Sequence, residues 1–157
     1  MAPKKKHNSD TDQLTFDTPD RLLLDSLILT HDAVLGAFQE LLRGYDVSYT
    51  QYCVLSILAE EGDDGMRTQK LGERLLTRVP DITRLVDRLI KAGLVQRDRS
   101  ESDKRVVFVS VTQAGLELLH EIQDPATELR TELFEHLSEN EQIKLNDLLM
   151  KLRSGVE

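Results

Sequence analysis

Apolar side chains recur at helical spacing along most of this chain. Between residues 19 and 43 the intervals alternate between four and three positions, which places these side chains in one stripe on a helix face. The stripe consists of Leu24, Ile28, His31, Leu35, Phe38 and Leu42. GYDVS breaks the pattern, and Ser48 with Gln51 then has the spacing of a capping box. This box predicts a second helix over residues 49–61, ended by GDDG.

Two shorter helices and a hairpin are expected in the middle of the chain. Thr68 is expected to cap a short helix through QKLGERLLT. The next helix is expected over about 79–92, with Thr77 as its cap and Pro80 in its first turn. Gly93 is suited to the position just beyond its end. LVQRDR and the β-branched RVVFVSV then flank the polar tip SESDK, which predicts a β-hairpin.

Two more helices are predicted at the C-terminal end. Thr112 is suited to start a long helix that reaches Leu137, with a kink expected at Pro125. Ser138 and Glu141 form a second capping-box pattern, which opens the last helix. A helix-turn-helix followed by a hairpin is the order of a winged helix. The expected fold class is therefore mostly α with a small β-hairpin wing, and further helices lie on both sides of the winged helix-turn-helix core.

Composition narrows the functional classes. At 157 residues, the chain has the length of one domain with tails. A single cysteine excludes an intramolecular disulfide framework and a zinc site built on several thiolates. The N-terminus lacks the apolar segment of a secretory signal, and no apolar run is judged long enough to cross a bilayer. We therefore expect a soluble, cytoplasmic protein.

The positive charge is concentrated in one part of an acidic chain. The formal net charge is −8, yet residues 67–105 hold eleven Lys and Arg against six Asp and Glu. A basic region in an acidic body is typical of a protein that approaches a polyanion with one face. Chance clustering on a solvated surface is the alternative explanation.

The second helix of a helix-turn-helix enters the major groove of DNA with its N-terminal half. The residues expected on its exposed side are Pro80, Asp81, Thr83 and Arg84. Arg84 can donate two hydrogen bonds to guanine, and Asp81 can accept one from cytosine or instead orient Arg84. Thr83 can contact a phosphate or a thymine methyl group, while Arg78 and Arg88 are suited to phosphates. In the alternative, these arginines simply pair with Asp81 and Asp87 on a solvated helix.

The hairpin tip strengthens the DNA-binding interpretation. Lys104 and Arg105 lie at or just after the turn of the hairpin. A thin wing with an arginine fits the narrow minor groove, where the negative potential is deepest. Asp103 is close enough in sequence to hold Arg105 through a salt bridge.

The segment LGERLLTRVPDITRLVDRLIKAGLVQRDRSESDKRVVFVSVTQAG resembles the MarR family of bacterial transcription regulators. The match rests on TRLVDRL, GLV, Arg97, DKR and VSVTQAG, and TQYCVLSIL resembles the helix before the DNA-binding motif. By position, Arg105 matches the minor-groove arginine of the family and Asp103 the aspartate that steadies it. Lys104 replaces the more usual arginine, and Arg78 and Pro80 depart from the small or polar residues of many members.

The resemblance implies a homodimer that binds a pseudo-palindromic operator in double-stranded DNA, and in many members a small-molecule pocket. Residues 1–18 are polar and charged without periodicity, which predicts a disordered basic and polar tail. The resemblance implies an N-terminal dimerisation helix at 19–47, a winged helix-turn-helix DNA-binding domain at 48–112 and C-terminal dimerisation helices at 113–157. The C-terminal leucines also favour a dimer, because they offer more apolar surface than one chain can cover. They are Leu129, Leu133, Leu137, Leu145, Leu148, Leu149 and Leu152.

The expected function is a repressor released by a small aromatic or phenolic effector. His31, Leu35 and Tyr52 are the candidate pocket residues, although His31 also suits a core or dimer interface and Tyr52 the underside of the helix-turn-helix. No cofactor and no enzymatic activity are expected. The alternatives are a winged-helix module that binds protein, redox sensing through Cys53, and metal sensing through His120 and His136.

Overall fold

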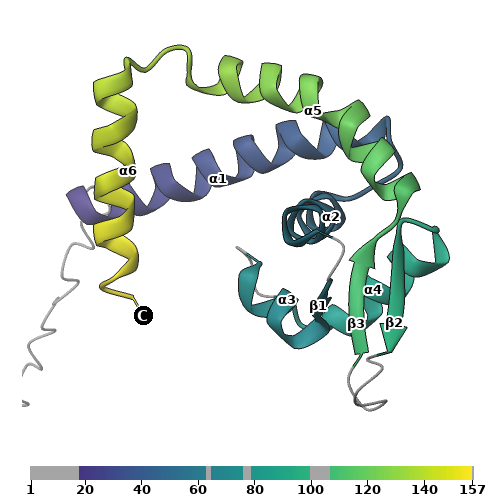
Figure 1. The fold of residues 1–157 in the computed structure, drawn as a ribbon. Helices are drawn as coiled ribbons and strands as arrows, with labels where there is room; N and C mark the ends of the chain where they lie inside the picture. Colours follow the sequence, from purple (N-terminus) through teal and green to yellow (C-terminus); the bar gives the residue numbers. More distant parts are fainter. Residues whose placement is uncertain (1–17, 63–64, 76–78, 100–106, 157) are drawn as a thin grey trace, which may run out of the picture. The chain divides into compact units, whose positions relative to one another are not determined.

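The computed structural model describes residues 18–62, 65–75, 79–99 and 107–156 of the chain (Figure 1). The chain divides after Val34 into two units, residues 1–34 and 35–157, which we describe separately. Helix α1 (Pro19–Arg43) runs across this division, and its bounds confirm the helix predicted from the apolar stripe.

The described part of the first unit is the N-terminal portion of α1. Most of its large apolar side chains are exposed; these are Leu22, Leu23, Leu24, Ile28 and Leu29. By length and composition alone, α1 passes a test for a membrane span, so the expectation that no such stretch exists was too strict. Core helices of soluble proteins and signal sequences can have the same length and composition as α1. Its acidic residues, Asp25 and Asp32 among them, are more typical of a helix in water.

The second unit begins with the end of α1 and with α2 (Tyr49–Glu61). Leu42 is fully buried, and the ring of Phe38 packs at 5.3 Å from that of Tyr49. The predicted capping box is confirmed: Ser48 N donates to Gln51 Oε1 at 2.8 Å, and Gln51 N donates to Ser48 Oγ at 3.3 Å. This box fixes where α2 starts, at one edge of the helix-turn-helix.

The two helices of the helix-turn-helix are shorter than predicted. Helix α3 spans Thr68–Arg74, so Thr68 is its first residue and not its cap. Helix α4 spans Ile82–Lys91, and its cap is Asp81, whose Oδ1 accepts from Arg84 N at 3.0 Å. Pro80 therefore precedes the helix. The predicted cap Thr77 lies outside the described residues.

Three strands form one antiparallel sheet in the order β1-β3-β2. Strands β2 (Val95–Arg99) and β3 (Val107–Val111) are the predicted hairpin, with Arg97 opposite Val109. Strand β1 (Met66–Arg67) was not predicted, because two residues carry no alternation and pair only through the fold. Gly93 ends α4 with φ 75°, as expected for a residue beyond a helix end.

One apolar core joins the sheet to helices α2, α3 and α4. Its buried members are Val54, Leu55, Leu58, Met66, Leu71, Leu85, Val86, Leu89, Val95 and Val109. Helix α4 packs against β2 beside this core (Figure 1). Because α4 is anchored on one side only, its opposite side stays in solvent.

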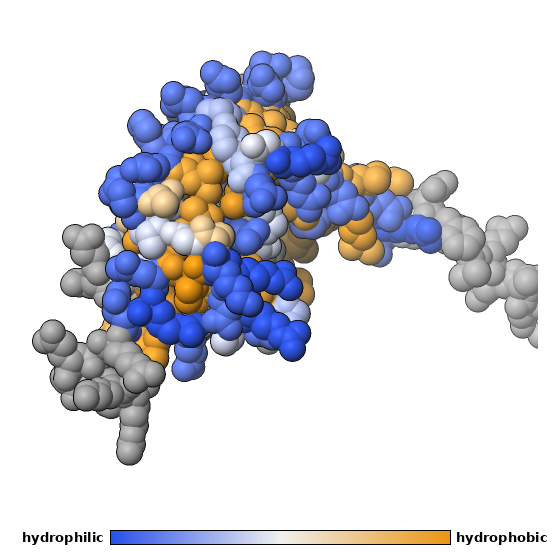
Figure 2. All heavy atoms as spheres, turned by 90° about the vertical axis from the view of Figure 1, so that its right-hand side faces the viewer, coloured by the Kyte–Doolittle hydropathy of each residue, from blue (hydrophilic) through white to orange (hydrophobic). Residues whose placement is uncertain are grey.

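Helices α5 (Gln113–Phe134) and α6 (Glu139–Arg153) complete the chain. Thr112 caps α5 as predicted, and α5 ends three residues before the expected Leu137 with Pro125 inside it. In the predicted capping box of α6, Ser138 N donates to Glu141 Oε2 at 2.9 Å. No residue of α6 is buried. Apolar side chains at the surface are also visible among polar ones in Figure 2.

Candidate nucleic-acid interface

Helix α4 presents a polar side to solvent. Leu85, Val86 and Leu89 face the core, and Ile82 and Ile90 are half-buried beside them, in agreement with the predicted buried face. The residues predicted on the other side are all exposed; they are Pro80, Asp81, Thr83, Arg84 and Arg88. An anchored helix with an exposed cationic N-terminal half has the arrangement of a recognition helix.

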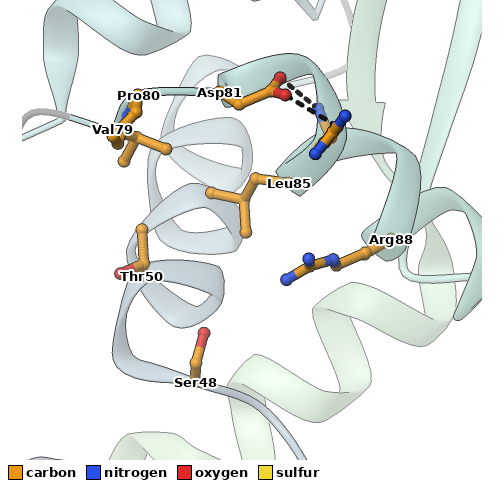
Figure 3. A pocket seen from close by; sticks show the side chains of 8 residues that line it. Ser48, Thr50, Val79, Pro80, Asp81, Leu85 and Arg88 are labelled. Carbon is orange, nitrogen blue, oxygen red and sulfur yellow. Dashed lines mark hydrogen bonds and ion pairs between the residues drawn. The ribbon is translucent and has the colours of Figure 1, made fainter.

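Asp81 contacts both the backbone and the side chain of Arg84. Its Oδ1 accepts from Arg84 N at 3.0 Å, and its Oδ2 lies 3.0 Å from Arg84 Nε (Figure 3). The Arg84 side chain is nevertheless 81% exposed. Of the roles predicted for Asp81, the geometry matches the orientation of Arg84. An Asp immediately before an apolar-periodic helix is a cap signal that the prediction of Thr77 overlooked.

An open groove of about 440 Å³ separates the start of α4 from the start of α2 (Figure 3). It is lined by Ser48, Thr50, Val79, Pro80, Asp81, Arg84, Leu85 and Arg88. Ser48 and Thr50 line the groove from the start of α2 (Figure 3). Local sequence patterns assign neither Ser48 nor Thr50 to this face, because β1 and α3 separate α2 from α4 in the chain and only tertiary packing brings the two helices together.

An ion pair connects the wing to α4. Arg97 Nη2 on β2 donates to Asp87 Oδ1 on α4 at 2.8 Å. The pairing of Asp87 with Lys91, which helix spacing made possible, is not the one observed. Both side chains are more than a third exposed, so the pair contributes little to stability and mainly sets the position of Arg97.

Four of the predicted DNA contacts lie outside the described residues. They are Arg78, which precedes α4, and Asp103, Lys104 and Arg105 at the hairpin tip. Their roles at phosphates and in the minor groove therefore stay predictions. The strands that lead to the tip, β2 and β3, are described up to Arg99 and from Val107.

A second basic side chain fastens α3 to α2. Arg74 Nη1 donates to Glu61 Oε2 at 2.8 Å, and its Nη2 donates to Glu60 Oε2 at 2.9 Å. Lys70 adds a contact of 3.5 Å to Glu61 Oε1. These partners lie nine to fourteen residues apart, so no local spacing signal reveals them.

The predicted effector residues do not form one cluster in the second unit. Tyr52 lines an open cavity of about 590 Å³ between α2 and α5, which is consistent with the pocket position predicted for it. Leu35 on α1 is half-buried. His31 belongs to the first unit, where its side chain is 64% exposed and its Nδ1 lies 3.2 Å from Asp32 Oδ1.

Polar, charged and apolar side chains line the cavity between α2 and α5. They are Tyr52, Ser56, Ala59, Glu60, Leu116, Leu119, His120, Gln123 and Arg130. His120 was considered as a metal ligand together with His136. Within the described ranges no group of three or more His, Cys, Asp or Glu side chains is placed to hold a metal ion. Hydrogen-bonding groups beside leucines are instead what a small polar aromatic molecule requires.

Cys53 is half-buried on α2. Burial raises the pKa of its thiol above the ordinary value, and a hydrogen bond with Tyr49 offsets only part of this effect. A raised pKa makes the reactive thiolate scarcer at neutral pH. The environment of Cys53 therefore disfavours the redox-sensing alternative.

Comparison with known proteins agrees with this geometry. The family profile of the transcriptional regulator SarA/Rot matches residues 37–122, from the last part of α1 to the first half of α5. The chain is also 31% identical to the HTH-type transcriptional regulator SarZ of Staphylococcus aureus over 123 residues, or 78% of each chain. The chain belongs to the SarA/Rot family, whose members are winged-helix transcriptional regulators of the MarR type.

Solved structures of MarR proteins have the same fold as this member of the SarA/Rot family. A MarR transcription factor from Planctomyces limnophilus has a TM-score of 0.67 at 33% identity, over 86% of this chain and 98% of its own. A mutant MarR from E. coli in complex with operator DNA has a TM-score of 0.75 at 26% identity, over 85% and 95%. These similarities confirm the predicted fold class and the MarR resemblance.

Proposed function

We propose that this regulator is a repressor that binds a pseudo-palindromic operator as a homodimer and is released by a small molecule. Helix α4 enters the major groove, and the hairpin formed by β2 and β3 enters the flanking minor groove. The regulator acts in the cytoplasm, where it binds DNA and catalyses no reaction.

The exposed side of α4 is the observation that carries this proposal. Arg84 and Arg88 project from it, Thr83 is exposed next to Arg84, and the side opposite is buried in the core. The side chain of Arg88 has no hydrogen-bond or ion-pair partner among the residues that the structure describes, although the Arg88 backbone oxygen accepts from Ala92 N. A free guanidinium beside a base-reading arginine is suited to a phosphate, so α4 carries both kinds of DNA contact.

Exposed apolar surface supports the dimer. Helix α6 buries none of its residues, and Leu145, Leu148, Leu149 and Leu152 are all between 37% and 56% exposed. A soluble protein rarely leaves a continuous apolar helix face in water. A two-fold interface built on α6 covers this face and spaces two copies of α4 for successive major grooves.

The effector proposal rests on the cavity between α2 and α5. Both walls belong to helices that connect the proposed interface with the DNA-binding core, since α2 packs on both α5 and β3. A ligand that prefers one spacing of these helices shifts the protein away from the DNA-binding conformation. Tyr52, His120 and Arg130 offer groups that suit a small phenol or aromatic acid.

Selection of genomic DNA fragments by the purified full-length protein tests the proposal. Binding to the recovered fragments is measured at two salt concentrations, for the wild type and for Arg84→Ala. We expect a recovered pseudo-palindrome, a steep loss of affinity with salt, and a weaker, less selective variant. If no sequence is enriched and the variant behaves as wild type, α4 does not read DNA, and a protein-binding winged helix replaces the proposal.

A further inference from the structure

Both carboxylate oxygens of Asp81 contact Arg84. One oxygen accepts from the backbone N of Arg84 and the other lies against its Nε, each at 3.0 Å. The first contact belongs to the cap of α4 and is fixed with the helix. The second contact therefore orients the guanidinium of Arg84 relative to the helix backbone.

This contact leaves the two terminal nitrogens of the Arg84 guanidinium available to donate hydrogen bonds. Its Nε is engaged by Asp81, and its two terminal nitrogens have no partner in the described part of the chain. The terminal pair forms a planar fork that matches the O6 and N7 acceptors of guanine. A free arginine side chain samples many rotamers, and ordering it beforehand reduces the entropy lost on binding.

The same carboxylate is unfavourable for general attraction to DNA. It places a negative charge beside Arg84, at a surface proposed to approach phosphates. Stability does not require this charge, since an exposed ion pair contributes little and serine or asparagine caps a helix equally well. A residue that serves only as a cap has no need of the ionised carboxylate.

We propose that Asp81 is a positioning residue that aims Arg84 at a single guanine, so that it raises sequence discrimination while it lowers affinity for random DNA. The inference rests on the proposed function, because it concerns the base contact of α4. It predicts opposite effects of one substitution on two measured quantities, which a purely structural role does not produce.

The test uses Asp81→Asn in the full-length protein. Asparagine keeps the cap but loses the charge that holds Arg84. Arg84→Ala first identifies the operator position at which the protein loses its base preference. Dissociation constants are then measured on the selected operator, on operators with each of the other bases at that position, and on random DNA. A bidentate contact to guanine corresponds to about tenfold discrimination or more.

We expect Asp81→Asn to lose most of that discrimination and to bind random DNA more tightly than the wild type. Asp81→Ser, a second capping variant, should behave the same way. In the background of Arg84→Lys, Asp81→Asn should have no further effect on discrimination, because lysine cannot form the fork. Thermal unfolding of each variant checks that α4 still folds.

Glu73→Gln is the matched control. It removes one negative charge from the exposed side of α3, where Glu73 contacts only Gln69 among the described residues. We expect a small gain in affinity for random DNA and unchanged discrimination.

Two results would overturn the inference while the regulator proposal stands. In the first, Asp81→Asn and Asp81→Ser both discriminate between bases as well as the wild type does. In the second, Arg84→Ala changes the base preference at no position of the operator. A wild-type protein that selects no sequence at all is a different outcome, since it refutes the proposed function itself.

Discussion

Gly115 decides how closely the first turn of α5 approaches the wing. A Cβ built on Gly115 meets the backbone oxygen of Leu94 at less than contact distance, and Cγ2 of Val111 at 2.7 Å. The Leu94 oxygen cannot move away freely, because it accepts from Thr112 N at 3.0 Å. Gly115→Ala must therefore push α5 away from the hairpin.

Two effects of opposite sign compete in this variant. Alanine is the better helix former by about 1 kcal/mol. Overpacking against rigid backbone costs about 1–3 kcal/mol and sometimes more. Since the nearest atom is a hydrogen-bonded backbone oxygen, we expect the clash to dominate, with a net loss of about 1–2 kcal/mol in the free energy of unfolding.

Denaturant unfolding measures this difference at a fixed protein concentration, because the stability of the proposed homodimer would depend on concentration. Gly72→Ala in α3 is the control. Its new Cβ meets only Ile82 at ordinary contact distances of 3.8 and 3.9 Å, so it should gain up to about 1 kcal/mol. If Gly115→Ala is as stable as Gly72→Ala, the close approach of α5 to Leu94 is not a feature of the folded protein.

Four further changes have expected outcomes. Ser48→Ala removes the α2 capping box and should lower the unfolding free energy by about 1 kcal/mol, measured by thermal melting. The hydrogen bond from Ser138 lowers the pKa of Glu141, so the ionised carboxylate stabilises the fold above the ordinary carboxyl pKa, and this stabilisation is lost as the pH falls through the lowered pKa. An acid titration of helicity should show this loss, and Glu141→Gln should abolish this part of the pH dependence. Cys53 should react with a maleimide more slowly than a small free thiol at pH 7, because burial raises its pKa. Arg88→Ala should reduce the slope of binding against salt by about one phosphate contact, whereas an unchanged slope would remove Arg88 from the interface.

Local patterns in the sequence predicted those features that depend on three or four adjacent residues. Both capping boxes, at Ser48 and Ser138, are found at the predicted helix starts. The apolar periodicity also identified the buried side of α4. Such features are predictable because donor, acceptor and apolar spacing lie within one helical turn.

The start of α4 shows where local rules compete. Pro80 is tolerated in a first turn and Thr77 is a permissible cap, which together favoured a helix from residue 79. Asp81 is also a preferred cap, and its second oxygen gains a contact to Arg84 that threonine cannot provide. The carboxylate with two partners is the better start, and the helix begins three residues later than predicted.

Contacts between distant residues were beyond prediction. Strand β1 exists because Met66 pairs with Val109, more than forty positions away. The partner of Asp87 is Arg97 on the wing, although Lys91 has the correct spacing on the same helix. Both choices depend on how the sheet packs against α4, which periodicity does not encode.

These ion pairs change the interpretation of the basic region. Counting charges over residues 67–105 suggests a strong attraction to any polyanion. In the structure, Arg74, Arg84 and Arg97 each have a carboxylate partner, so part of that charge is balanced within the protein. In the proposed function, selective binding depends on the direction of arginines that carboxylates hold. Arg88, whose side chain has no partner within the described ranges, then supplies attraction to phosphates. A regulator that must reject random DNA benefits from this arrangement, because charge alone attracts every sequence equally.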